Sequence, residues 1–293
     1  MRVFVTGASG FVGTAAVREL RAAGHSIVGL ARSDAAAAAL KAAGVEALMG
    51  DLTRPETLAL GASKADAVIH LAFDHDFSKF ADNAANEQRA IAALGDALAG
   101  TQKLLIVTSG VGMISAPGRP STEDDAPPSA SGFPRAPEKA TEALAQKGVR
   151  VAVVRLPQVH DTKKAGLVSY VIEIARQKGF VGYVGDGSNQ WSAAHVDDVG
   201  RLYRLALEKN ATGRYHAVGE EGVPLRTIAD VVGRGLKVPV RSISHEEAPG
   251  YFGWMGHLAG ADVRSSSAKT QATLGWKPTG PGLIADLEKL EWV

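Results

Sequence analysis

The chain has 293 residues, of which 45% are hydrophobic and 22% are charged, and its formal net charge is +1. This composition is ordinary for a soluble globular protein, and the small net charge argues against nucleic acid or an anionic membrane as the main partner. The chain has no cysteine, which excludes disulfides, thiolate metal sites and a cysteine nucleophile.

The beginning of the chain and the distribution of its apolar residues suggest where the protein works. A strand is expected to start at Arg2, which leaves no room for a signal peptide. No apolar run is long enough to span a membrane. We therefore expect a cytoplasmic protein. At this length the chain can bury one large core and carry a smaller lobe.

The first predicted elements are a strand, a glycine-rich turn and a helix. Arg2–Thr6 is short, apolar and β-branched, and residues 14–23 are alanine-rich and helical in pattern. Between them, Gly7 allows a tight turn, Gly10 leaves room for a pyrophosphate and Gly13 lets helix and strand pack closely. The helix N-terminus adds free N–H groups and a positive dipole end. The glycines could serve the turn alone, but their position between strand and helix predicts a nucleotide site.

Apolar strand-like segments alternate with helical ones through the first half of the chain. The expected strands are 3–5, 26–30, 47–48, 67–71, 103–108 and 150–155. The expected helices are 14–23, 35–42, 83–99 and 137–147. This order predicts a doubly wound parallel sheet with helices on both faces. A ligand is then expected at the carboxyl ends of the strands.

The alternation stops after residue 155, which predicts a separate C-terminal lobe. Helices are expected at 166–177, 196–209 and 225–235, a short strand at 214–218, and a long loop at 116–134. The segment 242–277 concentrates large apolar side chains, namely Tyr251, Phe252, Trp254, Met255 and Trp276. They suit a lobe that closes over a substrate or, as we favour for most of them, the lobe's own core.

Three sequence motifs resemble the extended short-chain dehydrogenase/reductases, which include sugar epimerases, dehydratases and 3β-hydroxysteroid dehydrogenase-like proteins. The first is Gly-x-x-Gly-x-x-Gly directly after Thr6. The others are Gly185-Asp-Gly187 with His195-Val-Asp-Asp-Val199, and Leu274-Gly-Trp276-Lys-Pro278. The resemblance covers almost the whole chain. It implies a Rossmann-type α/β sheet with a small C-terminal α/β substrate lobe.

The resemblance also implies a division of labour between two domains. We expect residues 1–160, with the returning segment 188–218, to form the dinucleotide-binding domain. Residues 161–187 and 219–293 would form the substrate-binding lobe. The family's dimers pair the two helices expected here at 83–99 and 137–147, so we expect a homodimer. The small side chains Ala84, Ala85, Ala92 and Ala93 would permit close packing there, although they could equally pack on their own sheet.

The end of the second strand predicts which nicotinamide cofactor binds. An acidic residue there binds the ribose 2′-hydroxyl of NAD, whereas a basic residue accommodates the 2′-phosphate of NADP. Ala31 occupies the expected acidic position and Arg32 follows it. A guanidinium suits a phosphate in charge and geometry, so we expect NADP(H). The alternative is a solvated surface arginine.

The motif and the resemblance together give a set of expected cofactor-binding residues. Asp51 would contact the adenine, although it could also cap the next helix. The set is Gly7, Ser9, Gly10, Phe11, Val12, Gly13, Arg32, Ser33, Asp51, Leu52, Leu71, Ala72, Phe73, Thr108, Lys139 and Pro157. His70, Asp74, His75 and Asp76 superficially suggest a metal, but nothing else has ligand spacing, so we predict no metal site.

The family's catalytic pattern is broken at one position. It uses a tyrosine as acid or base, a lysine four residues later and a serine after the fifth strand. Here Arg135 stands at the tyrosine position, Lys139 follows at the expected offset, and the serine position falls on Gly110 with Ser109 before it. The chain therefore resembles an atypical member of the family. Arginine stays protonated and cannot shuttle a proton, so Arg135 would act as an electrophile, as a clamp, or only as a surface residue that positions the cofactor.

A histidine after the sixth strand completes the expected site. His160 ends a segment, starting at Arg155, that resembles the one passing the nicotinamide in the family. It could move a proton or orient substrate, or simply be satisfied by local hydrogen bonds. The expected catalytic residues are Ser109, Arg135, Lys139 and His160. The expected substrate contacts are His75, Gly110, Val111, His160, Asn189 and Trp191.

These observations predict an NADP(H)-dependent oxidoreductase of the atypical extended short-chain type. It would reduce a carbonyl, or oxidise an alcohol, on a small organic substrate. One alternative is a nucleotide-sugar epimerase or dehydratase, which is disfavoured because those reactions rely on the missing tyrosine. Another is a non-catalytic NADP-binding sensor or regulator, which would keep the glycine loop and Arg32 but lose acid–base chemistry.

Overall fold

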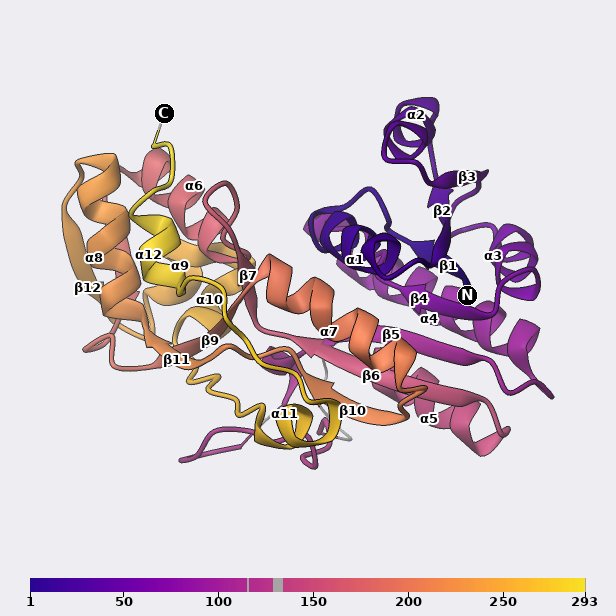
Figure 1. Ribbon diagram of the computed structural model, residues 1–293. Coiled ribbons are helices and arrows are strands. Elements are labelled where there is room, and N and C mark those ends of the chain that lie inside the picture. Colours follow the sequence, from indigo (N-terminus) through magenta and orange to yellow (C-terminus); the bar gives the residue numbers. More distant parts are fainter. Residues whose placement is uncertain (115, 129–133, 293) are drawn as a thin grey trace. The chain divides into compact units, whose positions relative to one another are not determined.

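The computed structural model describes residues 1–114, 116–128 and 134–292 (Figure 1). The chain forms two compact units. The first comprises Met1–Ser109, the described part of Ser129–Arg155, and Val199–Tyr215; the second comprises the described parts of Gly110–Pro128, Leu156–Asp198 and His216–Val293. These units divide the chain at other residues than the predicted domains, and the functions predicted for those domains remain predictions. Within the expected loop 116–134, residues 129–133 lie outside the described residues.

The first unit is built on a seven-stranded parallel sheet. Its strand order is β10-β6-β5-β4-β1-β2-β3, which reverses direction at β1, as a doubly wound sheet requires. The strands are β1 (Arg2–Thr6), β2 (Ser26–Ala31), β3 (Glu46–Met49), β4 (Ala67–His70), β5 (Leu104–Gly110), β6 (Arg150–Leu156) and β10 (Gly213–His216). Val3, Phe4 and Val5 of the central strand are fully buried, because helices cover both of its sides.

Helices pack on both faces of this sheet (Figure 1). They are α1 (Phe11–Ala22), α2 (Asp34–Ala42), α3 (Pro55–Ser63), α4 (Phe80–Leu98), α5 (Pro137–Gln146) and α7 (Val196–Glu208). Small residues set the closest approaches. A Cβ on Gly61 of α3 would lie 2.4 Å from Phe4, and one on Gly95 of α4 would lie 2.3 Å from Leu144 of α5. The core between sheet and helices is therefore closely packed.

The second unit contains two small sheets. One has the order β11-β9-β7 and the other is the parallel pair β12-β8. Their bounds are β7 (Gln158–His160), β8 (Val181–Val184), β9 (Gln190–His195), β11 (Glu220–Pro224) and β12 (Val240–Ile243). The helices are α6 (Val168–Lys178), α8 (Leu225–Leu236), α9 (Ala248–Phe252), α10 (Gly256–Ala259), α11 (Ala268–Leu274) and α12 (Leu283–Leu287). Short 3-10 turns occur at η2 (Val111–Met113) and η3 (Gly253–Met255) in this unit, and at η1 (Phe77–Lys79) in the first unit.

The large apolar side chains of the segment 242–277 mostly form core, as favoured. Tyr251, Phe252, Met255 and Trp276 are all at most 8% exposed. Trp254 is the exception, because it is 50% exposed, and its ring meets Tyr170 edge to face. Within the described part of the chain, no helix combines the length and apolar character that a bilayer crossing requires.

Candidate functional site

The glycine loop after β1 has the geometry that its spacing predicts. Gly7 has a φ of +71°, and a Cβ on Gly13 would lie 1.9 Å from the carbonyl oxygen of Gly7. Both positions therefore require glycine. A Cβ on Gly10 would meet only the Gly7 oxygen within 4 Å, at 3.1 Å. The remaining space around Gly10 is open, which is the cradle that a pyrophosphate needs.

The N-terminus of α1 is left electrostatically unsatisfied. Gly10 is its N-cap, provides no side-chain cap, and the first turn contains no acidic residue. The first N–H groups of a helix lack intrahelical partners and carry the positive end of the dipole. Phe11 and Val12 lie in this turn and are half-buried, whereas Ser9 is exposed beside it. The loop and helix end therefore fit an anionic phosphate group.

The residues that would hold the adenosine end lie after β2 and β3. Arg32 is exposed directly beyond β2. Ser33 is the N-cap of α2, and its hydroxyl accepts a hydrogen bond from the N–H of Ala36 at 3.2 Å. Asp51 accepts from the N–H and the hydroxyl of Thr53 at 2.7 and 2.8 Å, and these bonds, followed by the nearby Arg32 charge, lower the pKa of Asp51. The N-cap of α3 is Arg54, so Asp51 does not cap that helix. Leu52 beside it is half-buried.

The carboxyl end of β4 is tied to β1 through a buried histidine. His70 is 1% exposed, and its Nδ1 lies 2.8 Å from the hydroxyl of Thr6. Burial, followed by the charge of Arg135, lowers the pKa of His70 to about 3, so the imidazole is neutral. The next residues of the chain, Leu71, Ala72 and Phe73, are half-buried. They lie at the carboxyl end of the strand, where the sequence predicted cofactor contacts.

Arg135 forms a buried ion pair with a residue that the sequence analysis did not single out. Its Nη2 and Nε donate to the two carboxylate oxygens of Glu87 on α4 at 2.6 and 2.9 Å. The two side chains are 15% and 2% exposed. The guanidinium carbon also lies 4.3 Å from the ring centre of Phe73, a cation–π contact. Nη2 further donates to the carbonyl oxygen of Thr108 at 3.4 Å. Arg135 is therefore not a freely solvated surface side chain.

A second buried carboxylate, Glu138, binds Ser109 and directly precedes Lys139 in the chain. The hydroxyl of Ser109 donates to Glu138 at 3.0 Å. Glu138 also receives hydrogen bonds from Arg155 at 2.7 and 2.8 Å and from Arg214 at 3.0 Å. Ser109 is thus engaged in a structural network. Lys139 follows Glu138 in the first turn of α5 and is exposed, where the helix dipole disfavours a cation.

In the second unit, His160 belongs to a buried cluster. Its Nδ1 lies 2.8 Å from a carboxylate oxygen of Asp286, and its ring meets that of His195 edge to face at 5.9 Å. His160 is 1% exposed, and its Nε2 has no hydrogen-bond partner among the described residues. Burial lowers the pKa of His160, although Asp286 opposes this. Among these residues, the His160 ring is therefore hydrogen-bonded only through Nδ1, to a residue 126 positions away, and not by the local hydrogen bonds that the sequence analysis offered as the alternative.

The other predicted substrate contacts differ in their burial and in their hydrogen bonds. Trp191 is fully buried, and its indole N–H donates to the carbonyl oxygen of Leu258 at 3.2 Å, which favours a role in the core. The amide of Asn189 donates to two backbone carbonyl oxygens at 3.0 Å each. Gly110 and Pro157 are half-buried, Val111 is buried, and His75, in the first unit, is exposed.

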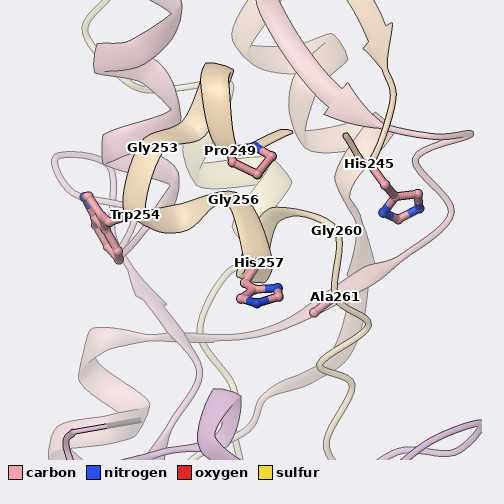
Figure 2. A pocket seen from close by; sticks show the side chains of 8 residues that line it. All are labelled: His245, Pro249, Gly253, Trp254, Gly256, His257, Gly260 and Ala261. Atoms are coloured by element: carbon pink, nitrogen blue, oxygen red, sulfur yellow. The ribbon is translucent and has the colours of Figure 1, made fainter. Parts of the chain in front are cut away.

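The second unit also contains a hollow of about 510 Å³ (Figure 2). None of the sequence-predicted site residues lines it. Its lining is His245, Pro249, Gly253, Trp254, Gly256, His257, Gly260 and Ala261. Across residues 1–114, 116–128 and 134–292, no group of three or more His, Cys, Asp or Glu side chains could hold a metal ion.

Sequence reasoning missed the partners of several predicted site residues. Glu87, Glu138 and Asp286 each hold a predicted residue, yet they lie 48, 29 and 126 residues from it. No spacing rule connects such distances. The usable signal was the presence of acidic residues within otherwise amphipathic helices, at positions that the helical period places on the buried side.

Comparisons with known proteins agree with this geometry. The model of the NAD dependent epimerase/dehydratase family matches residues 3–219. An uncharacterised protein of Schizosaccharomyces pombe is 43% identical, with 98% of each chain covered. A 3-diazoavenalumate denitrifying reductase of a Streptomyces species is 28% identical, covering 96% of this chain and 97% of that one. A 2′-dehydrokanamycin reductase of Streptomyces kanamyceticus is 31% identical, covering 83% and 69%.

Among solved structures, UDP-glucose 4-epimerase of Thermus thermophilus, in a complex with NAD, superimposes with a TM-score of 0.78. It is 21% identical and is matched over 100% of this chain and 99% of that one, which confirms the fold expected from the sequence. The family model covers well over half of the chain, from β1 to the end of the parallel sheet. The chain therefore belongs to the NAD-dependent epimerase/dehydratase family.

Proposed function

We propose that the protein is an NADP(H)-dependent oxidoreductase that reduces a carbonyl, or oxidises an alcohol, on a small organic substrate. The observation that carries the proposal is Arg135, which stands where the family has its acid–base tyrosine and is fixed by Glu87 at the carboxyl end of β5. An arginine cannot exchange protons at neutral pH, but it can donate hydrogen bonds to a carbonyl oxygen that gains negative charge.

The cofactor residues fit this proposal. The glycine loop and the N-terminus of α1 would hold the pyrophosphate, and exposed Arg32 would contact the 2′-phosphate. Asp51, already fixed as an acceptor by Thr53, would face the adenine. Lys139 would hold the ribose. When bound, the nicotinamide supplies or accepts the hydride.

The proton that completes a carbonyl reduction needs a source other than tyrosine. The hydroxyl of Ser109 already donates a hydrogen bond to Glu138, and His160 is 1% exposed with its Nδ1 bonded to Asp286. Lys139 is exposed and lies four residues from Arg135. We therefore propose a water molecule held by Lys139 as the proton donor, with Arg135 as the oxyanion-stabilising group.

The second unit is proposed as the substrate-binding lobe, with Gly110, Val111 and Asn189 as its contact residues. His160 would orient this region through its bond to Asp286 rather than move the proton. Two relatives, at 28% and 31% identity, are named as reductases, which supports reduction. Separately, epimerisation is disfavoured because an epimerase would need the acid–base group that Arg135 replaces.

A turnover screen tests this function. The purified protein is incubated with NADPH, or with NADH as a control, and a panel of ketones and aldehydes, while nicotinamide absorbance and alcohol products are measured. We expect NADPH oxidation that is matched by alcohol formation. Tight NADPH binding without turnover would instead indicate a sensor. Conversion of UDP-sugars without net nicotinamide oxidation would indicate an epimerase.

A further inference from the structure

The guanidinium of Arg135 is held on three sides, all by residues of the first unit. Glu87 receives two of its donors in a bidentate arrangement, Thr108 receives another hydrogen bond through its carbonyl oxygen, and Phe73 covers one face. Nη1 donates to no residue that the structure describes, and it is not among the buried atoms without a partner. One edge of the guanidinium is therefore both fixed and accessible.

The charge of this arginine is already compensated. Glu87 is 2% exposed and lies 2.6 Å from Nη2 of Arg135. Burial raises the pKa of Glu87, while the charge and hydrogen bonds of Arg135 oppose this shift and favour the carboxylate. The opposite charges of the pair nearly cancel for a ligand nearby. The Arg135 charge also acts on His70, His75 and Tyr203. Burial lowers the pKa of His70 to about 3 and raises that of Tyr203, so neither adds a charge at neutral pH.

We propose that Glu87 is a positioning residue which, by pairing with Arg135, makes the site select a neutral carbonyl over a ketone that carries a carboxylate or phosphate near its reacting carbon. This inference rests on the proposed function and deepens it by naming the substrate class. An unpaired arginine attracts anions in bidentate fashion. Here the carboxylate partner is supplied by the protein, so an anionic ligand beside the neutralised pair would lose its hydration without gaining a free positive charge in exchange.

The test compares two ketones that differ only in charge, such as an aryl ketone and the same ketone bearing a ring carboxylate. Their binding to the NADP⁺ complex, which has no hydride to transfer, is measured by calorimetry, so that turnover does not interfere. The wild-type protein is expected to bind the neutral ketone about tenfold or more tightly than its charged counterpart, because a charge that is desolvated without a free partner is costly.

Glu87→Gln separates charge from shape, because it keeps an acceptor oxygen but removes the negative charge. This variant is expected to raise the affinity for the carboxylate-bearing ketone, relative to the neutral ketone, by about tenfold or more. Glu87→Asp retains the charge but shortens the side chain. It is expected to keep the discrimination while kcat for the neutral ketone falls, because Arg135 is no longer held in place. A purely structural ion pair would lower stability in both variants without changing the affinity ratio.

The outcomes are separable from those of the turnover screen. If the wild-type complex binds the carboxylate form equally well or better, or binds neither ketone, the inference is overturned whatever the variants do. If Glu87→Gln folds and its affinity ratio matches that of the wild type, the inference is also overturned. If the expected ratio appears but neither ketone is reduced, the selectivity stands and the proposed reaction fails.

Discussion

Arg32 lies exposed beyond the end of β2. Its charge contributes to lowering the pKa of Asp51, which follows β3. If it contacts the 2′-phosphate, NADPH should bind more tightly than NADH. Arg32→Ala should then remove most of this preference, a loss of about tenfold or more for one charge-assisted contact. Dissociation constants from nicotinamide fluorescence for both cofactors provide the measurement.

Arg89→Ala is the matched control, because Arg89 is an exposed arginine on α4. It should leave both dissociation constants unchanged. Equal affinities of the wild-type protein for NADPH and NADH would contradict the assignment of Arg32.

His70 makes the stability of the first unit depend on pH. Burial lowers its pKa from 6.5 to about 3 in the folded protein. Below pH 6.5 the unfolded chain therefore binds a proton that the folded chain does not, and stability is lost as the pH falls from 6.5 toward 3, by about 1.4 kcal/mol per pH unit. His70→Asn, which retains a polar group near Thr6, should reduce this loss between pH 7 and pH 5 by about 2 kcal/mol.

Urea unfolding at several pH values measures this difference. His257→Asn is the control, because His257 is exposed, and it should behave like the wild type. The same pH dependence in His70→Asn and in the wild type would show that His70 is not the buried neutral group described above.

Among individual residues, the sequence predicts those that belong to a motif and misses those that contact a motif residue only in the folded protein. Arg135 could be identified because it breaks a spaced pattern. Its partner Glu87 could not, because it approaches from another helix only after the sheet has formed. The same holds for Asp286, which reaches His160 across 126 residues. Ser33 shows the converse, since a predicted cofactor residue also proved to be a helix cap.

The loop that joins β1 to α1 provides a test at the scale of one element. Gly13→Ala places a Cβ 1.9 Å from a backbone oxygen, so the loop must move. It should lower the free energy of unfolding by about 1–3 kcal/mol, as overpacking does, and abolish NADPH binding. Gly10→Ala meets only one atom, at 3.1 Å, and should keep the fold while weakening NADPH binding, because its methyl group enters the proposed phosphate cradle.

Chemical unfolding and cofactor titration of the two variants distinguish these effects. Loss of stability in both variants, or unchanged NADPH binding by Gly10→Ala, would contradict the proposed position of the pyrophosphate.

The elements of the first half were predictable because apolar strand segments there alternate regularly with helical segments. The six expected strands of that half are observed, with ends that differ by one or two residues. Helix α3 was implied only by the alternative role of Asp51 as a cap and its bounds were not predicted, because Pro55–Ser63 has little amphipathic contrast and its packing depends on Gly61 meeting Phe4. The strands of the second unit have three to six residues, too short for a two-residue period to stand out.

For the molecule as a whole, we predict a homodimer built on α4 and α5. The proposed alanine face is narrower than expected, because Ala84 is buried in the first unit while Ala92 is exposed. A glutamate at that face would have to be desolvated in a dimer. Ala92→Glu should therefore shift the molar mass measured by light scattering at micromolar concentration from dimer to monomer.

Ala38→Glu on α2 is the control, because Ala38 is exposed on a helix outside the expected interface. It should leave the mass unchanged. A monomeric wild-type protein under the same conditions would contradict the dimer.

Arg135 is proposed to stabilise the developing oxyanion in place of the missing tyrosine. This role is tested most directly by the steady-state rate of NADPH-dependent carbonyl reduction by Arg135→Ala, measured against pH beside the wild type. In Arg135→Ala, kcat is expected to fall by about 10²–10³, as when one oxyanion donor is removed, while the pH optimum stays in place because arginine does not titrate. Full activity in Arg135→Ala would contradict this role and leave Arg135 as a structural partner of Glu87.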